Sequence, residues 1–223
     1  TILADYVVLT LPFTKLREVD LNLKEMTANK KKAIQEIGYG QNNKIVLGYK
    51  SKAWQEDGNK FQGNLYNKAV TNGLDASDVK SVDTKAANYL LFLGGDESVR
   101  LANLAVKDPR APAHHVWKTN LPENEIQKYV DELDIIYPKS KQKYDNKHVF
   151  ACWSSYPWVN ASYTCFKPGQ WTEIMPYVDI PIGNIHFAGE HCSIDWQGFM
   201  NGGAETGRLA AEEIVKKINT KIK

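Results

Sequence analysis

The stretch that decides the fold is IHFAGEHCSIDWQGFMNGGAETGRLAAEEIVKKI, residues 185–218. A short apolar strand is predicted to end in Ala188-Gly189-Glu190, and a turn rich in aromatic residues and glycine follows it. A long helix then begins near Met200. Its apolar face comprises Ala204, Gly207, Ala211, Ile214, Val215 and Ile218. A strand, a glycine-rich turn and a helix are the parts from which many nucleotide-cofactor sites are built.

Several residues of this unit suit a planar ligand. Gly189 lets a group approach the backbone closely, and Glu190 can accept hydrogen bonds from sugar hydroxyls. Small residues at 202–204 let the first helical turn press against a planar group or another backbone. A helix N-terminus carries free N–H groups and about half a positive charge, which would favour negative charge on a bound group. An ordinary capping or salt-bridging carboxylate is the alternative role for Glu190.

Composition excludes several classes of protein. The 223 residues carry a net charge of +2, too small to indicate a nucleic-acid or membrane-surface partner, and Lys30-Lys31-Lys32 is expected on a solvated helix face. No apolar run approaches the roughly 20 residues of a membrane span. Cys152, Cys165 and Cys192 lack metal-ligand spacing, so no metal is predicted, although one disulfide stays open. The compartment is not indicated.

The order of elements predicts strands mixed with helices. Apolar runs predict strands within residues 5–12, 43–49, 88–95 and 148–153, the first of them covered on both faces. Thr27 is a suitable N-cap for a helix with Ala33, Ile34 and Ile37 on one face. A second helix is expected over 121–136, and another is capped by Asp96 or Ser98. Residues 58–85 are polar and turn-rich, typical of short strands or of a mobile excursion.

Many residues between 187 and 211 match a known family signature in the same order. The matching residues are Phe187-Ala188-Gly189-Glu190, then Gly198-Phe199-Met200, then Glu205-Thr206-Gly207 followed by Ala210-Ala211. The C-terminal region strongly resembles the C-terminal signature of the FAD-dependent amine oxidase family. Monoamine, polyamine and L-amino-acid oxidases belong to that family. Upstream, DYVVLTLPFTKL, NNKIVLGYKSKAW and the Trp153, Ser162-Tyr163 and KPGQ series are similar to its earlier elements.

The resemblance implies a fold between α/β and α+β. Residues 1–12 would be a strand of the FAD domain, 13–155 a mixed-sheet, α+β substrate-binding domain, and 156–223 the C-terminal part of the Rossmann-like FAD domain. The partner it implies is an N-terminal FAD-binding half that carries the G-x-G-x-x-G fingerprint. A homodimer is left open.

The resemblance also assigns roles to residues. Tyr163 and Phe199 would be the catalytic pair of aromatic side chains beside the flavin, between which an amine approaches. The residues expected to contact or line FAD are Glu190, Gly189, Trp153, Gly198, Met200 and Ala204. Without the resemblance, core packing explains the aromatic residues better, and packing is the role expected of Trp158 and Trp171. Glu205 and Arg208 are expected to pair within the last helix.

Two positions depart from the family. Ser162 stands where monoamine oxidases attach FAD to a cysteine, so FAD is expected to be non-covalent here. The lysine that many members place near the flavin has no counterpart in register around Arg17 and Glu18, although Lys15 is close. That role is therefore left unassigned.

The implied activity is oxidation of a C–N bond of an amine or amino acid by hydride transfer to FAD. The products would be an imine, then a carbonyl compound, with oxygen reduced to hydrogen peroxide. An amino-acid substrate would require an arginine for its carboxylate, with Arg17, Arg100 and Arg110 as candidates; a primary amine is slightly favoured. The alternatives are an FAD-dependent desaturase or isomerase, and a non-catalytic module that needs an N-terminal partner. Without that half the chain is expected to be inactive.

Overall fold

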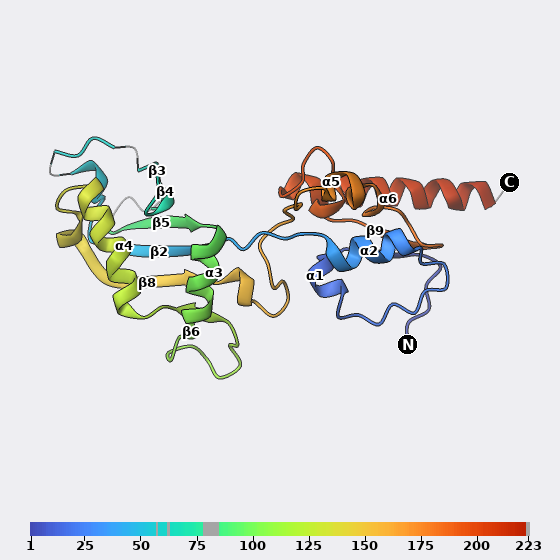
Figure 1. The fold of residues 1–223 in the computed structure, drawn as a ribbon, viewed down its shortest axis with the longest axis horizontal. Helices are drawn as coiled ribbons and strands as arrows, with labels where there is room; N and C mark the ends of the chain where they lie inside the picture. The colour runs from blue at the N-terminus through green and yellow to red at the C-terminus, as the bar shows by residue number, and fades with distance from the viewer. Residues whose placement is uncertain (57, 62, 78–84, 222–223) are drawn as a thin grey trace. The chain divides into compact units, whose positions relative to one another are not determined.

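The structure is a computed structural model, and it describes residues 1–56, 58–61, 63–77 and 85–221. The chain forms two compact units (Figure 1). Unit 1 comprises residues 1–40 and 161–223, and unit 2 comprises residues 41–160. Of the predicted 58–85 excursion, residues 62 and 78–84 lie outside the described residues.

Unit 2 is built on a five-stranded antiparallel sheet (Figure 1). The strand order is β3-β4-β5-β2-β8. The strands are β3 (Leu65–Asn67), β4 (Thr71–Asp75), β5 (Ala87–Leu93), β2 (Asn43–Tyr49) and β8 (Tyr144–Ala151). β2 pairs with β5 in a register that joins Ile45 to Leu91 and Leu47 to Tyr89. The predicted strands at 43–49, 88–95 and 148–153 thus fall at the centre and one edge of the sheet.

Two helices cover one face of this sheet. They are α3 (Gly95–Leu104) and α4 (Glu123–Ile136), which pack on the alternate buried residues of β2 and β5. The remaining elements are η1 (Ala53–Gln55), β6 (Val106–Lys107), β7 (Lys118–Asn120), η2 (Ser140–Lys143) and η3 (Trp153–Ser155). The buried side chains that alternate along the strands pack against those that repeat every 3.6 residues along α4, and together they form one apolar core.

The expected caps of α3 are not observed. Gly94 is the N-cap residue, so the helix begins before Asp96, which lies in its first turn. Ser98 lies inside the helix and is fully buried, where its hydroxyl oxygen accepts a hydrogen bond of 2.9 Å from the Asn43 side chain. The prediction was wrong because a glycine N-cap leaves no side-chain signature.

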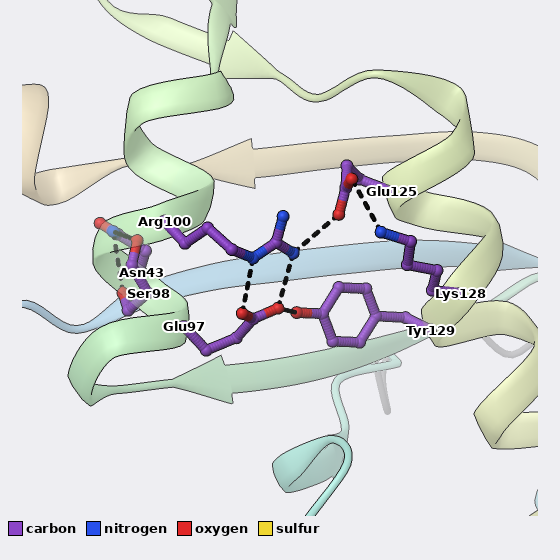
Figure 2. A network of polar contacts seen from close by, with 7 residues as sticks. All are labelled: Asn43, Glu97, Ser98, Arg100, Glu125, Lys128 and Tyr129. Carbon is purple, nitrogen blue, oxygen red and sulfur yellow. Dashed lines mark hydrogen bonds and ion pairs between the residues drawn. The ribbon is translucent and has the colours of Figure 1, made fainter.

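A network of charged residues ties α3 to α4 (Figure 2). The Arg100 guanidinium donates two hydrogen bonds of 2.8 Å to Glu97 and one of 2.7 Å to Glu125. Tyr129 donates to Glu97 at 2.6 Å, and Lys128 donates to Glu125 at 2.9 Å. The hydrogen bonds from Arg100 lower the pKa of Glu97 to about 2. Arg100 therefore has a structural role, because it connects α3 to α4.

Unit 1 brings the two ends of the chain together. β1 (Val7–Leu9) pairs in parallel with β9 (Ile185–Phe187), so that Val8 lies opposite His186. The helices are α1 (Phe13–Leu16), α2 (Ala28–Glu36), α5 (Gln170–Glu173), η4 (Met175–Tyr177), η5 (Glu190–Cys192) and α6 (Met200–Lys221). Thr27 caps α2 as predicted, by accepting the backbone N–H of Lys30 at 3.2 Å.

β1 differs from its prediction. Val7 and Val8 are each 40% exposed, whereas a strand covered on both faces was expected. The reason is that, within the described residues, the apolar cluster of unit 1 includes Leu9 of β1 but neither Val7 nor Val8.

Unit 1 also has a core of its own. Phe13 and Leu16 of α1 pack with Ile34 of α2 and Phe187 of β9, and all four are buried. Residues 13–40 therefore belong to the same unit as the chain ends, and the boundaries lie at 40/41 and 160/161. The sequence-based boundaries were 12/13 and 155/156, because Pro12 is a strong strand terminator whereas the α1–α2 packing is not visible in sequence.

Lys30 corrects the prediction of a solvated lysine triplet. Its side chain is buried at 1% exposure, and its Nζ donates to the Val178 carbonyl at 2.6 Å and lies 3.3 Å from the centre of the Phe187 ring. Burial lowers the pKa of Lys30 to about 7. Lys30 shares a helix face with Ala33, Ile34 and Ile37, a spacing that places it toward the core.

The buried Lys30 predicts an unusual pH dependence of stability. From pH 7 upward the folded chain releases this proton, while the unfolded lysine keeps it until about pH 10.5. The free energy of unfolding is therefore expected to rise between pH 7 and 9, by about 1.4 kcal/mol per pH unit at most. Urea unfolding at pH 7, 8 and 9 measures it. Lys30→Met should flatten the rise, and the exposed control Lys31→Met should keep it. An equally steep rise in Lys30→Met would contradict this origin.

Candidate functional site

Tyr163 and Phe199 line one cavity of unit 1, of about 550 Å³. The Tyr163 side chain is 38% exposed and that of Phe199 is 65% exposed, so neither is a core residue. The complete lining comprises Tyr163, Thr164, Cys165, Phe166, Trp171, Gln197, Gly198 and Phe199. The two proposed catalytic aromatic residues thus meet at a hollow with aromatic walls.

Backbone pairing fixes the segment that carries Tyr163. The Gly40 N–H donates to the Tyr163 carbonyl at 2.8 Å, and the Ser162 N–H donates to the Gly40 carbonyl at 2.9 Å. The Cys165 N–H donates to the Gly38 carbonyl at 2.9 Å. A Cβ at Gly38 would lie 2.3 Å from the Cys165 carbonyl oxygen, so this close approach requires glycine.

The Glu190 carboxylate joins the two segments of the cavity. Its Oε1 accepts the Thr164 N–H at 2.9 Å and the Thr164 hydroxyl at 2.7 Å. Its Oε2 accepts the Gly198 N–H at 2.7 Å. The sequence pointed to Glu190 as a ligand contact or an ordinary capping carboxylate. In the structure it connects the neighbours of Tyr163 and Phe199.

Two further features complete this connection. The Gln197 side-chain amide donates to the Thr164 carbonyl at 2.7 Å. Gly198 has φ of +80°, and a Cβ there would lie 3.5 Å from the Tyr163 ring. Glycine at 198 therefore supplies the turn conformation, and this turn passes close beside the Tyr163 ring.

Gly189 is closely approached by a side chain of the protein itself. It has φ of +147°, and an added Cβ would lie 2.4 Å from His191 Cε1. Its N–H donates to the Thr206 hydroxyl at 2.9 Å, and that hydroxyl lies 3.0 Å from the Gly189 carbonyl oxygen. Burial lowers the pKa of His191 to about 4, so its ring is neutral where it packs at 4.6 Å on Phe13. Through its hydrogen bonds with Thr206, Gly189 holds the end of β9 against α6.

The start of α6 presents an open face. Met200 is 93% exposed and Ala204 is exposed, while the helix is held to its unit through the buried Gly202 and Thr206. A Cβ at Gly207 would meet nothing within 4 Å. Gly202, Gly203 and Ala204 are small residues in the first turns of α6, and N–H groups at a helix N-terminus can hold an electron-rich edge of a flavin. The residues present therefore fit one side of a flavin site.

Trp153 belongs to unit 2. Its ring lies 4.9 Å from that of Trp117 and 5.8 Å from that of Tyr156, in a half-exposed aromatic cluster. The Trp117 indole donates to the Cys152 carbonyl at 2.8 Å. The described geometry therefore gathers every predicted site residue except Trp153 in unit 1.

Some residues of the cavity were missed by the sequence analysis. Trp171, assigned to packing, is 48% exposed and lies edge-to-face with Phe166 at 5.2 Å. Thr164 and Gln197 received no role. The position of Thr164 directly after Tyr163, and of Gln197 directly before Gly198, was the available signal. Trp158 is 72% exposed, so it is not a packing residue either.

Several charged residues have structural partners. Lys15 pairs with Glu18, and Arg17 donates to the Ile34 and Ile37 carbonyls at the end of α2. These contacts do not show that Lys15 or Arg17 takes the place of the lysine that many family members have near the flavin.

The expected Glu205–Arg208 pair is not formed. Arg208 pairs instead with Glu212 at 2.6 Å, the i,i+4 partner, and Glu205 accepts the Ser193 hydroxyl at 2.6 Å. Among the described residues the three cysteines are free thiols, and no group of side chains suitable for a metal ion occurs. Within the same residues, no helix has the length and apolar character to cross a bilayer.

Comparison with known proteins agrees with this geometry. Residues 1–215 match the family of flavin containing amine oxidoreductases. The chain belongs to this family. The predicted family and its FAD cofactor are thereby confirmed.

The relatives are longer than this chain. YobN of Bacillus subtilis (strain 168), a putative L-amino-acid oxidase, is 26% identical over 95% of this chain and 41% of its own length. A flavin-containing amine oxidase of Danio rerio is 24% identical over 95% of this chain and 37% of its own length. The chain therefore spans about two fifths of the length of these relatives.

The solved structures agree in fold. Cyclohexylamine oxidase from Brevibacterium oxydans IH-35A superposes with a TM-score of 0.77 at 21% identity, over 97% of this chain and 44% of that one. Wild-type putrescine oxidase bound to putrescine gives a TM-score of 0.73 at 19% identity. The mixed α/β character of the amine oxidoreductase fold is thus confirmed.

Proposed function

We propose that this chain is the C-terminal portion of a flavin amine oxidase that oxidises a C–N bond. The observation that carries the proposal is the cavity in which Tyr163 and Phe199 face a common hollow, held through Glu190. The overall reaction would convert an amine, water and oxygen into a carbonyl compound, ammonia and hydrogen peroxide. When bound, the flavin would supply the two-electron redox chemistry.

The proposed roles of the residues follow from their places. Tyr163 and Phe199 would orient the amine between two aromatic faces and exclude water from the reacting carbon. The open start of α6, with the Met200 N–H, would hold one edge of the flavin. Glu190 has a fourth lone-pair position beyond the three donors described, which a ribityl hydroxyl would occupy.

The remaining predicted contacts with FAD are also proposals. Gly198 would leave room for the flavin beside Tyr163, and Ala204 would pack flat against it from α6. Gly189 would contribute by fixing the strand that carries Glu190. Trp153 would approach the flavin ring from the substrate-binding domain. Ser162 forms no thioether, so FAD would be released intact on denaturation.

The partner of unit 1 would be an N-terminal FAD-binding half. Val7 and Val8 on β1 and Leu209, Val215 and Ile218 on α6 are each 40–55% exposed apolar side chains. These exposed apolar side chains on a strand and a helix would be buried by that half. In this account the chain alone is inactive, and unit 2 belongs to the substrate-binding domain.

The substrate class we favour is a primary amine. The three candidate arginines are engaged by their own chain: Arg17 by carbonyls, Arg100 by Glu97 and Glu125, and Arg110 by Asp108 at 2.7 Å. Each of these guanidinium groups thus has a partner within its own chain. The likeness to a putative L-amino-acid oxidase favours an amino acid as the second candidate.

Turnover by the assembled protein tests the function. The chain is combined with the N-terminal FAD-binding half and supplied with primary amines, polyamines or L-amino acids in air. The expected result is carbonyl product with one hydrogen peroxide per amine consumed. Flavin-dependent change of a substrate C–C bond without peroxide would instead identify the desaturase or isomerase, and loss of flavin binding would leave the non-catalytic module.

A further inference from the structure

Hydrogen bonds connect the segment that carries Tyr163 to the turn that carries Phe199. We name this connection the Glu190 clamp, and it comprises Glu190, Thr164, Gln197 and Gly198. We propose that this clamp sets the spacing of Tyr163 and Phe199, so that Glu190 is a positioning residue for the aromatic pair as well as a flavin contact. The inference rests on the proposed function for its catalytic meaning, and on the structure alone for its geometry.

Each oxygen of the Glu190 carboxylate serves one side of the cavity. Oε1 accepts both donors of Thr164, at 2.9 and 2.7 Å, and Oε2 accepts the Gly198 N–H at 2.7 Å. Hydrogen bonds to an ionised acceptor are roughly twice as strong as neutral ones. The planar carboxylate therefore fixes the distance between two backbone segments that are 34 positions apart in sequence.

Gln197 closes the connection from the opposite direction. Its amide donates to the Thr164 carbonyl at 2.7 Å, so the N–H, hydroxyl and carbonyl of Thr164 are all engaged by the clamp. Thr164 is buried at 2% exposure, which limits competition from water. The segment carrying Tyr163 thus has little freedom to move relative to the 197–199 turn.

Both aromatic residues are one peptide bond from the clamp. Tyr163 precedes Thr164, and Phe199 follows Gly198. A Cβ at Gly198 would lie 3.5 Å from the Tyr163 ring, so the turn passes close to one ring of the pair. A displacement of either clamp end would therefore move a ring at the cavity, and a shift of about 1 Å in substrate-positioning groups can cost about a hundredfold in rate.

The first test measures the ring position in the chain itself. The chain is labelled with 3-fluorotyrosine, and Tyr163→Phe identifies the 19F resonance of Tyr163. Thr164→Val removes the hydroxyl donor, and we expect the Tyr163 resonance to shift. Thr164→Ser should restore it. Thr172→Val is the matched control, because Thr172 donates its hydroxyl to Gly169 at 2.9 Å without touching the clamp.

The second test is kinetic. In the assembled protein with equal flavin content, Thr164→Val should slow anaerobic flavin reduction at saturating amine by about tenfold, and Thr164→Ser should recover most of the rate. If Thr164→Val does not fold, Gln197→Leu removes the opposite connection and receives the same two measurements.

The outcomes separate the two proposals. A Tyr163 resonance in Thr164→Val that coincides with the wild-type one overturns the clamp, and so does a shifted resonance with a wild-type rate. If the wild-type assembly does not reduce its flavin with any amine, the proposed function fails, while the resonance still decides whether the clamp positions Tyr163.

Discussion

Replacing Tyr163 with alanine is expected to lower kcat/KM for the amine by about a hundredfold in the assembled protein, with flavin content unchanged. The side chain lines the cavity and packs beside Gly198, so its removal takes away one wall of the hollow without opening the core. Loss of one of two orienting faces leaves the amine free to approach in unproductive poses. Phe199→Ala should produce a loss of the same kind.

The assay is steady-state peroxide production, together with the absorbance of bound flavin. Trp158→Ala is the control, because Trp158 is a 72% exposed aromatic residue outside the cavity lining. Its kcat/KM should match the wild-type value. A wild-type kcat/KM in both Tyr163→Ala and Phe199→Ala would remove the aromatic pair from the proposed site.

The largest effect on stability is expected from Gly189→Ala. A φ of +147° with ψ of 169° lies in a region that is essentially restricted to glycine. The new Cβ would also lie 2.4 Å from the His191 ring, which is buried and packed on Phe13. Backbone strain and overpacking together should cost about 3–5 kcal/mol.

Thermal and urea unfolding of the chain measure this cost. Gly207→Ala is the matched control, since a Cβ there meets nothing within 4 Å and an alanine suits a helix better than glycine by about 0.5–1 kcal/mol. We expect Gly207→Ala to be at least as stable as the wild type. Equal unfolding midpoints for Gly189→Ala and the wild type would show that His191 does not hold this turn.

Patterns with a clear period were predicted from sequence. The alternating residues of β2 and β5 and the helical spacing of Ile126, Tyr129, Val130 and Leu133 gave the sheet and one of its covering helices. Thr27 was a sufficient signal for the start of α2 because its side chain forms the cap itself. Local hydrogen-bonding and burial rules decide these features, so one segment of sequence contains the information.

Features that depend on distant segments were not predicted. Lys30 was read as solvated because charge dominates its local context, although helical spacing placed it with Ile34 on the buried face. The inclusion of residues 13–40 in unit 1 depends on Phe13 meeting Phe187, which lies far along the chain. Such contacts become visible only in three dimensions.

In the candidate site too, sequence motifs indicated some residues, whereas contacts between distant segments were not predicted. Tyr163, Phe199 and Glu190 were proposed through the family motif, and the structure describes the contacts that connect them. Thr164 and Gln197 were not proposed, because their roles arise from hydrogen bonds between segments that the motif treats separately. The motif proposes which residues form the site, and the geometry describes how those residues are held.

The most direct test of the account is flavin retention by the two halves. The chain is incubated with FAD, desalted and examined by visible absorption, alone and with the N-terminal FAD-binding half. A flavin spectrum is expected only when both halves are present, with the flavin released on denaturation. Flavin retained by this chain alone would contradict a cofactor site shared between two halves, and absence of flavin from both samples would contradict the flavin site itself.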